Sequence, residues 1–302
     1  MGIVVQKYLS QDQTIRIASC VSTELINDIV KFQAMTPLAS TLLGRAVTGA
    51  VLMASQLKDG QKVGLHFHGK GPIGSLFAEA SYDGKARAYC ENKSVQLPAG
   101  AEHLGFALGE GHLDVVRTLP FQREAHRGSV ELYSGEIGED IAYYLRQSQQ
   151  VPAIVALSAI PATEDGRLEI AGGYIVELMP GATEETKTQL EWIQSQAGSI
   201  SKRIRQGNSA DDLISPFKEV FDFEPIEHPY TVEHECICSI ERMEAALKLL
   251  GAKTIEDMIV KARAEAENAT CEFCGKCYQI SEEQLELILQ ELSGQSTPQS
   301  VH

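Results

Sequence analysis

The sequence has no long hydrophobic run and no sign of a secretion signal. No uninterrupted apolar segment approaches the roughly 18 residues that a membrane span needs. The most apolar stretch, Leu42 to Ala54, contains Arg45 and two glycines. The N-terminus lacks a charged segment followed by an apolar one, so no signal peptide is expected. We therefore expect a cytoplasmic protein that does not associate with membranes.

Positive charge is also scarce. The 302 residues include 26 Lys and Arg against 41 Asp and Glu, which gives a net charge of −15. The negative electrostatic field of such a chain repels a phosphate backbone, so we expect no nucleic-acid partner. The sequence also lacks a P-loop, a GxGxxG motif, an HExxH pair and a Ser-His-Asp motif. With no such constellation, we expect a protein that is not an enzyme.

Cysteine is concentrated at one end of the chain. Five of the seven cysteines lie in the last quarter, where Cys236 and Cys238 form one close pair and Cys271 and Cys274 a second, with Cys277 three residues further on. Two close pairs of thiolates supply the four soft ligands of a tetrahedral Zn²⁺ site. In a cytosolic chain, such cysteines more often serve metal or redox chemistry than a disulfide framework. We predict one Zn²⁺ per chain, in the reduced state, on those two pairs.

The pattern around these cysteines leaves alternatives open. Cys277 or His234 can each replace one ligand of the set, and the spacing also fits an inert zinc knuckle. The surrounding block is small and has few large apolar side chains. Below about 40 to 70 residues, a hydrophobic core rarely stabilises a domain without a disulfide or a bound metal. A structural Zn²⁺ supplies on the order of 10 kcal/mol of folding free energy to such a module. The same sulfurs are suited to form two short-range disulfides if the metal leaves.

The other candidate residues indicate structural roles. Cys20 and Cys90 are single cysteines in apolar or strand-like contexts, so we expect buried small hydrophobic side chains. His66 and His68 are two residues apart, on one face of an expected strand beside a turn. We expect them to be exposed polar residues rather than metal ligands.

The hydrophobic patterns predict an α+β protein. Residues 1–182 are expected to form an N-terminal domain with helices and a mixed or antiparallel sheet, because alternating strands separated by hairpin signals outnumber the helices. The expected helices are 23–32, 36–57 and 137–146, and the expected strands are centred on 15–19, 63–67, 76–80, 86–89, 112–119, 129–133, 153–159 and 167–178.

Two further segments follow. Residues 183–230 are polar with scattered apolar anchors such as Trp192 and Phe217, which predicts an amphipathic helical linker. The linker either packs permanently against the first domain or is marginally stable and detaches. Residues 231–294 are expected to be the zinc-binding domain, with one helix capped by Ser239 and carrying Leu247, Leu249 and Leu250 on its apolar face, and with helices at 255–266 and 282–292. Residues 295–302 are expected to be a disordered tail.

Several motifs together resemble a known family over essentially the whole chain. They are Leu43-Gly44-Arg45-Ala46, Gly69-Lys70-Gly71-Pro72, Ser134-Gly135-Glu136-Ile137, Gly172-Gly173-Tyr174, Leu178-Met179-Pro180-Gly181-Ala182, Cys236-Ile237-Cys238-Ser239 and Cys271-Glu272-Phe273-Cys274. The sequence resembles the 33 kDa chaperonin family, the redox-regulated heat-shock holdases of bacteria. Cys277 departs from the family's usual pattern.

The resemblance implies a mechanism. Peroxide or hypochlorous acid would oxidise the zinc-bound thiolates, pairing Cys236 with Cys238 and Cys271 with Cys274 and releasing the metal. The zinc domain and linker would then unfold, and the uncovered apolar surface would bind unfolding client proteins without ATP. The resemblance also implies a homodimer in the oxidised, active state.

Two other classes of function remain as alternatives. One is a thiol-disulfide oxidoreductase that uses Cys271 and Cys274, although no thioredoxin-like βαβ pattern precedes them. The other is a zinc-ribbon module that binds nucleic acid or a transcription partner. Residues 231–302 carry 13 acidic and 6 basic residues, a net charge of −7 that opposes the second alternative.

Overall fold

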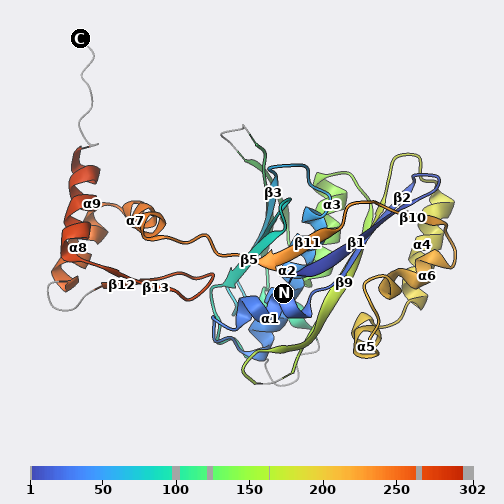
Figure 1. The fold of residues 1–302 in the computed structure, drawn as a ribbon, viewed down its shortest axis with the longest axis horizontal. Helices are drawn as coiled ribbons and strands as arrows, with labels where there is room; N and C mark the ends of the chain where they lie inside the picture. The colour runs from blue at the N-terminus through green and yellow to red at the C-terminus, as the bar shows by residue number, and fades with distance from the viewer. Residues whose placement is uncertain (1, 97–102, 121–124, 163, 263–266, 295–302) are drawn as a thin grey trace, which may run out of the picture. The chain divides into compact units, whose positions relative to one another are not determined.

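The structure, a computed structural model, describes residues 2–96, 103–120, 125–162, 164–262 and 267–294 (Figure 1). The chain divides into two compact units, Met1–Glu235 and Cys236–His302. The first is built on one large sheet with helices, and the second holds short helices around a hairpin, so the predicted α+β class is confirmed. The expected tail at 295–302, and the end of the helix expected at 255–266, lie outside the described residues.

A mostly antiparallel sheet forms the frame of the first unit. Its strands follow the order β7-β6-β3-β4-β5-β11-β1-β2-β9-β8, and β10 also pairs with β1. Among the described pairings, only β11 with β5 is parallel. The strands are β1 (Ile3–Ser10), β2 (Ile15–Val21), β3 (Lys62–Gly69), β4 (Ser75–Ser81), β5 (Lys85–Cys90), β6 (Gly111–Thr118), β7 (His126–Glu131), β8 (Ala153–Pro161), β9 (Leu168–Leu178), β10 (Phe223–Pro225) and β11 (Tyr230–His234).

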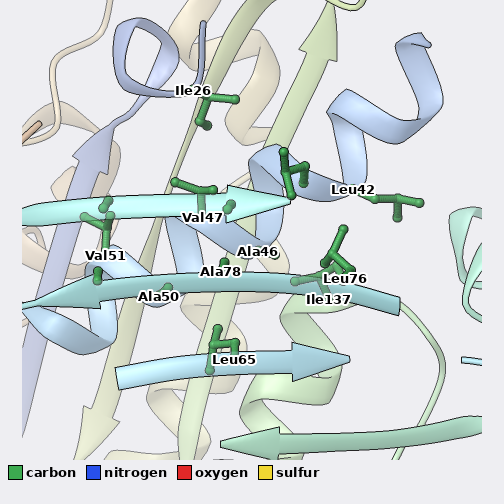
Figure 2. Close-up of a cluster of buried hydrophobic side chains, with 14 of the residues drawn as sticks. Ile26, Leu42, Ala46, Val47, Ala50, Val51, Leu65, Leu76, Ala78 and Ile137 are labelled. Carbon is green, nitrogen blue, oxygen red and sulfur yellow. The ribbon is translucent and has the colours of Figure 1, made fainter. Parts of the chain in front are cut away.

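One helix lies at the centre of the core. The sheet is accompanied by α1 (Thr23–Val30), α2 (Pro37–Ala54) and α3 (Ile137–Ser148), and α2 packs against strands from both halves of the sheet, β3, β4 and β5 in one and β2, β9 and β8 in the other. Figure 2 shows α2 residues such as Val47 and Val51 beside Leu65 of β3 and Leu76 of β4. By length and composition α2 resembles a membrane span, but 89% of that segment is buried inside the protein. Its hydrophobicity therefore reflects its position in the core of the first unit.

A glycine permits the close packing of α2 against α3. A Cβ added at Gly49 would lie 2.4 Å from Cδ1 of Ile141, closer than real Cβ contacts come. Pro37 occupies the first turn of α2, where its missing amide hydrogen costs no helix bond. Gly49 therefore lets α2 approach α3 closely, and Pro37 favours the start of the helix that was predicted from residue 36.

The predicted strands and helices of the first domain are present, with shifts of a few residues at their ends. The strands that the sequence analysis missed are β1 and those after Leu178. The short strands β10 and β11 pair with β1 across more than two hundred residues, as in the register Ile3↔Val232. Such short strands carry too little periodicity to be recognised from sequence alone.

The polar segment after β9 is docked on the sheet in this structure. It forms α4 (Glu184–Gln196), α5 (Ile200–Arg205), η2 (Asp212–Ile214) and α6 (Ser215–Lys218). Its buried side chains form one hydrophobic cluster with sheet residues of β1, β2 and β9: Leu190, Ile193, Ile200, Ile204, Leu213, Ile214 and Phe217 against Tyr8, Ile15, Ile17, Ile170, Tyr174 and Val176. We call this the docking cluster.

Of the two aromatic residues predicted to anchor this segment, only one is buried. Phe217 is fully buried, and its ring meets that of Tyr174 edge-on with centroids 5.4 Å apart. Trp192, in contrast, is 62% exposed. It lies on α4 between the buried residues Leu190 and Ile193 and projects away from the docking cluster. Trp192 is therefore not an anchor of this segment.

The second unit has a small core of its own. It contains α7 (Ile240–Lys248), α8 (Ala252–Ala262), β12 (Glu267–Thr270), β13 (Cys277–Ile280) and α9 (Glu282–Gly294). The Ser239 hydroxyl caps α7 as predicted, accepting a hydrogen bond from the Arg242 amide at 3.3 Å. The buried core residues are Leu247, Ile255, Ile259, Ile280, Leu285 and Ile288.

The predicted apolar face of α7 is only partly right. Leu247 is buried, but Leu249 is 87% exposed and Leu250 is 52% exposed. Both follow the last residue of the helix and precede Gly251, whose positive φ of 82° turns the chain. They therefore leave the helical face that Leu247 occupies.

Candidate metal centre

Four cysteines of the second unit come together in one group. Cys236 and Cys238 lie just before α7, and Cys271 and Cys274 lie in the turn that joins β12 to β13. Their Sγ atoms all lie within 4.8 Å of one another. The Sγ atoms of Cys236 and Cys271 lie 3.6 Å apart, and those of Cys238 and Cys274 lie 3.5 Å apart. Each close pair in sequence thus faces the other pair.

These distances fit metal ligands rather than disulfides. Sulfurs that surround Zn²⁺ tetrahedrally at about 2.3 Å lie about 3.8 Å from one another. A disulfide bond instead brings two sulfurs to about 2.05 Å. All four cysteines are free thiols. A single divalent ion between them fits with only small movements of the side chains.

The hairpin β12–β13 holds the second cysteine pair. The Cys271 amide donates to the Lys276 carbonyl at 2.9 Å, and the Gly275 amide donates to the Cys271 carbonyl at 2.8 Å. Gly275 has a positive φ of 70°, which favours glycine at this position. This closed turn presents Cys271 and Cys274 on the same side, so the sequence CEFCGK forms a local half-site.

The thiols differ in their electrostatic surroundings. Burial raises the pKa of Cys236 and of Cys274. Burial also acts against ionisation of Cys238, but the Tyr278 hydroxyl, which donates to its Sγ at 3.1 Å, and the neighbouring thiols lower its pKa to about 7. Four gathered thiolates repel one another, so a divalent cation is needed to hold all of them ionised.

The two alternative ligands have different positions in the fold. Among the residues that the structure describes, Cys277 is exposed on β13, opposite Thr270, and does not belong to the four-thiol group. His234 ends β11 and belongs to the first unit. Cys20 and Cys90 are completely buried, as predicted from their apolar contexts.

A second group with metal-binding potential was missed by the sequence analysis. His66 and His68 are half-buried rather than exposed, so that expectation is wrong. His68 joins His112 and Asp114 in a group whose ligand atoms lie within 4.8 Å of one another. The spacing of these residues in the sequence does not predict a metal site, because β3 and β6 are distant in sequence and only their register brings the residues together.

Comparisons with known proteins agree with this arrangement. The family model described as Hsp33 protein matches residues 4–281. A 33 kDa chaperonin from Desulfotalea psychrophila is 35% identical over 97% of this chain and 99% of its own length. One from Bacillus subtilis is 36% identical over 93% and 96% respectively. The crystal structure of a 33 kDa chaperonin from Thermotoga maritima superposes with a TM-score of 0.83, at 28% identity over 97% of this chain and 99% of that one.

A large sheet domain followed by a small module with four gathered thiols defines a redox-regulated chaperone. The chain belongs to the Hsp33 family. The resemblance noted in the sequence is thereby confirmed.

Proposed function

We propose that the reduced protein binds one Zn²⁺ through Cys236, Cys238, Cys271 and Cys274, and that oxidation of these thiols turns on an ATP-independent holdase. The observation that carries this proposal is the group of four free thiols at metal-ligand distances. When bound, Zn²⁺ holds the sulfurs as thiolates and ties the hairpin β12–β13 to the segment before α7.

The thiols themselves carry out the redox step. Two thiols and one hydrogen peroxide give one disulfide and two waters, so two peroxides oxidise all four cysteines. We propose disulfides Cys236–Cys238 and Cys271–Cys274, each within one short motif. Oxidation removes all four ligands, and the folding free energy that the metal contributes is lost with them.

The docked segment connects this loss to client binding. We propose that residues 1–182 bind clients and dimerise, that 183–230 act as a detachable linker, and that 231–294 are the switch. In support, the docking cluster places apolar residues of α4, α5 and α6 over an apolar sheet face. Undocking would uncover that face, and exposed apolar surface of this extent binds other proteins.

The remaining parts of the proposal concern partners and location. We infer that the protein is cytoplasmic, is not an enzyme, forms a homodimer when oxidised, and binds unfolding proteins but neither nucleic acid nor membranes. The net charge of −15 supports the exclusion of nucleic acid. An oxidoreductase role is disfavoured because the Cys271–Cys274 turn joins two strands, whereas thiolates activated by a helix dipole lie at a helix N-terminus.

Peroxide treatment is expected to convert a weak chaperone into a strong one. The measurement is the suppression of aggregation of a thermally unfolding client, with zinc content determined before and after oxidation. A Cys20→Ala/Cys90→Ala variant should respond in the same way, because both thiols are fully buried and burial raises the pKa of Cys20 to about 12. Full chaperone activity in the reduced, zinc-loaded protein would contradict the proposal.

Substitutions of two neighbouring cysteines are expected to differ in their effect on zinc content, because only one of the two belongs to the proposed ligand set. Cys274→Ser should lose most of its zinc, because it removes one of four sulfurs from the group. Cys277→Ser should retain the zinc of the cysteine site, since this exposed thiol is not a member of the four-thiol group. Elemental analysis of the purified reduced variants gives the answer. Zinc lost from the Cys277 variant but kept by the Cys274 variant would show that the assigned ligand set is wrong.

A further inference from the structure

The sheet face opposite the main core carries a compact cluster of histidines and one carboxylate. In the register of β3 and β6, His66 is opposite Asp114 and His68 is opposite His112. Leu65, Phe67, Leu113 and Val115 alternate with them and point into the core. The cluster therefore projects from the other face of two strands whose positions the core holds rigidly.

The two histidine rings aim at one carboxylate oxygen. Nε2 of His68 lies 3.3 Å from Oδ2 of Asp114, and Nε2 of His112 lies 3.5 Å from the same oxygen. The rings of His68 and His112 are stacked, with centroids 4.5 Å apart and planes 21° apart. The ring of His66 also packs against that of His68, with centroids 3.7 Å apart.

We infer that His68, His112 and Asp114 form a binding site for a divalent transition-metal ion that is independent of the four cysteines. Nitrogen and oxygen ligands at about 2.0 to 2.1 Å from a tetrahedral Zn²⁺ lie about 3.3 to 3.4 Å from one another. The separations from Asp114 to the two histidines are 3.3 and 3.5 Å. Two of the three ligand separations are therefore already those that a bound ion requires, and all three ligand atoms lie within 4.8 Å of one another.

Poorly satisfied polar atoms lie at the same place. The side chain of Asp114 is only 2% exposed. Within the described part of the chain, its buried Oδ1 receives no well-aligned hydrogen bond, and the buried Nε2 of His68 has the Asp114 carboxylate beside it at 3.3 Å without a well-aligned hydrogen bond. Buried polar atoms are normally satisfied, because leaving one unpaired costs about 1 to 3 kcal/mol. A cation bound between these residues would satisfy the imidazole nitrogen and the carboxylate.

Arg127 occupies part of this position in the present structure. Its guanidinium donates to Oδ2 of Asp114 from the neighbouring strand β7, and 61% of its side chain is exposed. An arginine so exposed is free to swing into solvent when a metal ion replaces it.

The ligand chemistry selects the class of ion. Two imidazoles and one carboxylate suit Zn²⁺, Co²⁺ and Ni²⁺, whereas Mg²⁺ and Ca²⁺ prefer sites made of oxygens. Three protein ligands leave a further coordination position open to water. The half-exposed His112, at 46%, leaves a path for the ion from solvent.

The test is the number of metal ions bound by the full-length, reduced protein. Equilibrium dialysis against Zn²⁺ in excess over the protein, followed by elemental analysis, should give two zinc ions per chain. His112→Ala should bind one, and its partial exposure makes unfolding of this variant unexpected, which circular dichroism checks. His126→Ala is the matched control, because His126 is an exposed histidine on β7 adjacent to Arg127 that points to the opposite face. One zinc in the wild type, or two in His112→Ala, would overturn the inference.

Two further measurements separate this site from thiol binding and test the role of Arg127. Co²⁺ added to the protein with zinc on its cysteines should give visible d–d bands without a thiolate-to-cobalt charge-transfer band, and His112→Ala should abolish them. A thiolate band instead would assign the second ion to a cysteine and overturn the inference.

Arg127→Gln should bind the second ion about two- to fivefold more tightly, because it removes the competing charge. Unchanged or weaker binding would show that the ion does not displace Arg127.

Discussion

Oxidation of the zinc-loaded protein is expected to unfold residues 236–294 while the sheet of the first unit stays folded. Among the described residues, the hydrophobic core cluster of the second unit has six buried side chains. A structural zinc in a module of this size contributes on the order of 10 kcal/mol, which exceeds what such a core supplies. Hydrogen exchange read by mass spectrometry should show loss of protection in α7 and α9 and retained protection in β3 and β6.

The pairing of the cysteines decides whether this unfolding occurs. Two pairs of close sulfurs join different motifs, Cys236 with Cys271 and Cys238 with Cys274. A disulfide across the 35-residue separation of the first pair would stabilise the folded module by about 4 kcal/mol, whereas the short loop of Cys236–Cys238 contributes about 1.5 kcal/mol. Only pairing within the motifs therefore leaves the module without a long-range link once the metal is gone.

Peptide mapping of the oxidised protein checks this pairing alongside the exchange measurement. Cys277→Ser serves as the control, since an exposed thiol outside the group should alter neither the pairing nor the unfolding. Retained protection in α9 after complete oxidation and zinc loss would contradict the expectation. Disulfides that join the two motifs would contradict the proposed pairing.

Phe217→Ala is expected to activate the chaperone in its reduced state. Phe217 is fully buried in the docking cluster, against the ring of Tyr174. Truncating a buried phenylalanine to alanine costs about 3 to 5 kcal/mol. The segment from α4 to α6 is a peripheral layer on the sheet, so this loss should fall mainly on its docking. Aggregation suppression without oxidant should rise towards the level of the oxidised wild type.

Trp192→Ala provides a matched control on the same segment. It removes an even larger aromatic side chain, but one that is 62% exposed and outside the docking cluster. A substitution on the surface changes stability by about 0.5 kcal/mol or less, so reduced Trp192→Ala should remain a weak chaperone. If exchange shows that Phe217→Ala has released α4 to α6 while chaperone activity stays low, the docking cluster does not conceal the client-binding surface.

Much of the architecture follows from local patterns in the sequence. The alternation of Val63, Leu65 and Phe67 predicted β3, because a strand buried on one face needs apolar side chains at every second position. The apolar run after Pro37 predicted α2. Ser239 predicted the start of α7, because an N-cap hydroxyl satisfies amides that the helix cannot.

Exposure of individual side chains could not be predicted in the same way. Trp192 and Phe217 are both aromatic residues in a polar segment, yet one is exposed and the other is fully buried. Which side of a short helix meets the sheet depends on what the sheet offers at that place, here Tyr174 on β9. Propensity and periodicity do not contain that information.

The sequence alone determined the four gathered cysteines, because two short motifs with ligands two and three residues apart each form a local half-site. Only the tertiary structure decided that β11 joins β1 and β5, and that His68, His112 and Asp114 meet. The physical reason is the same for the position of β11 and for the meeting of the two histidines with Asp114. Neighbours across strands are set by the register between segments far apart in the chain, and that register follows from packing the whole sheet around α2.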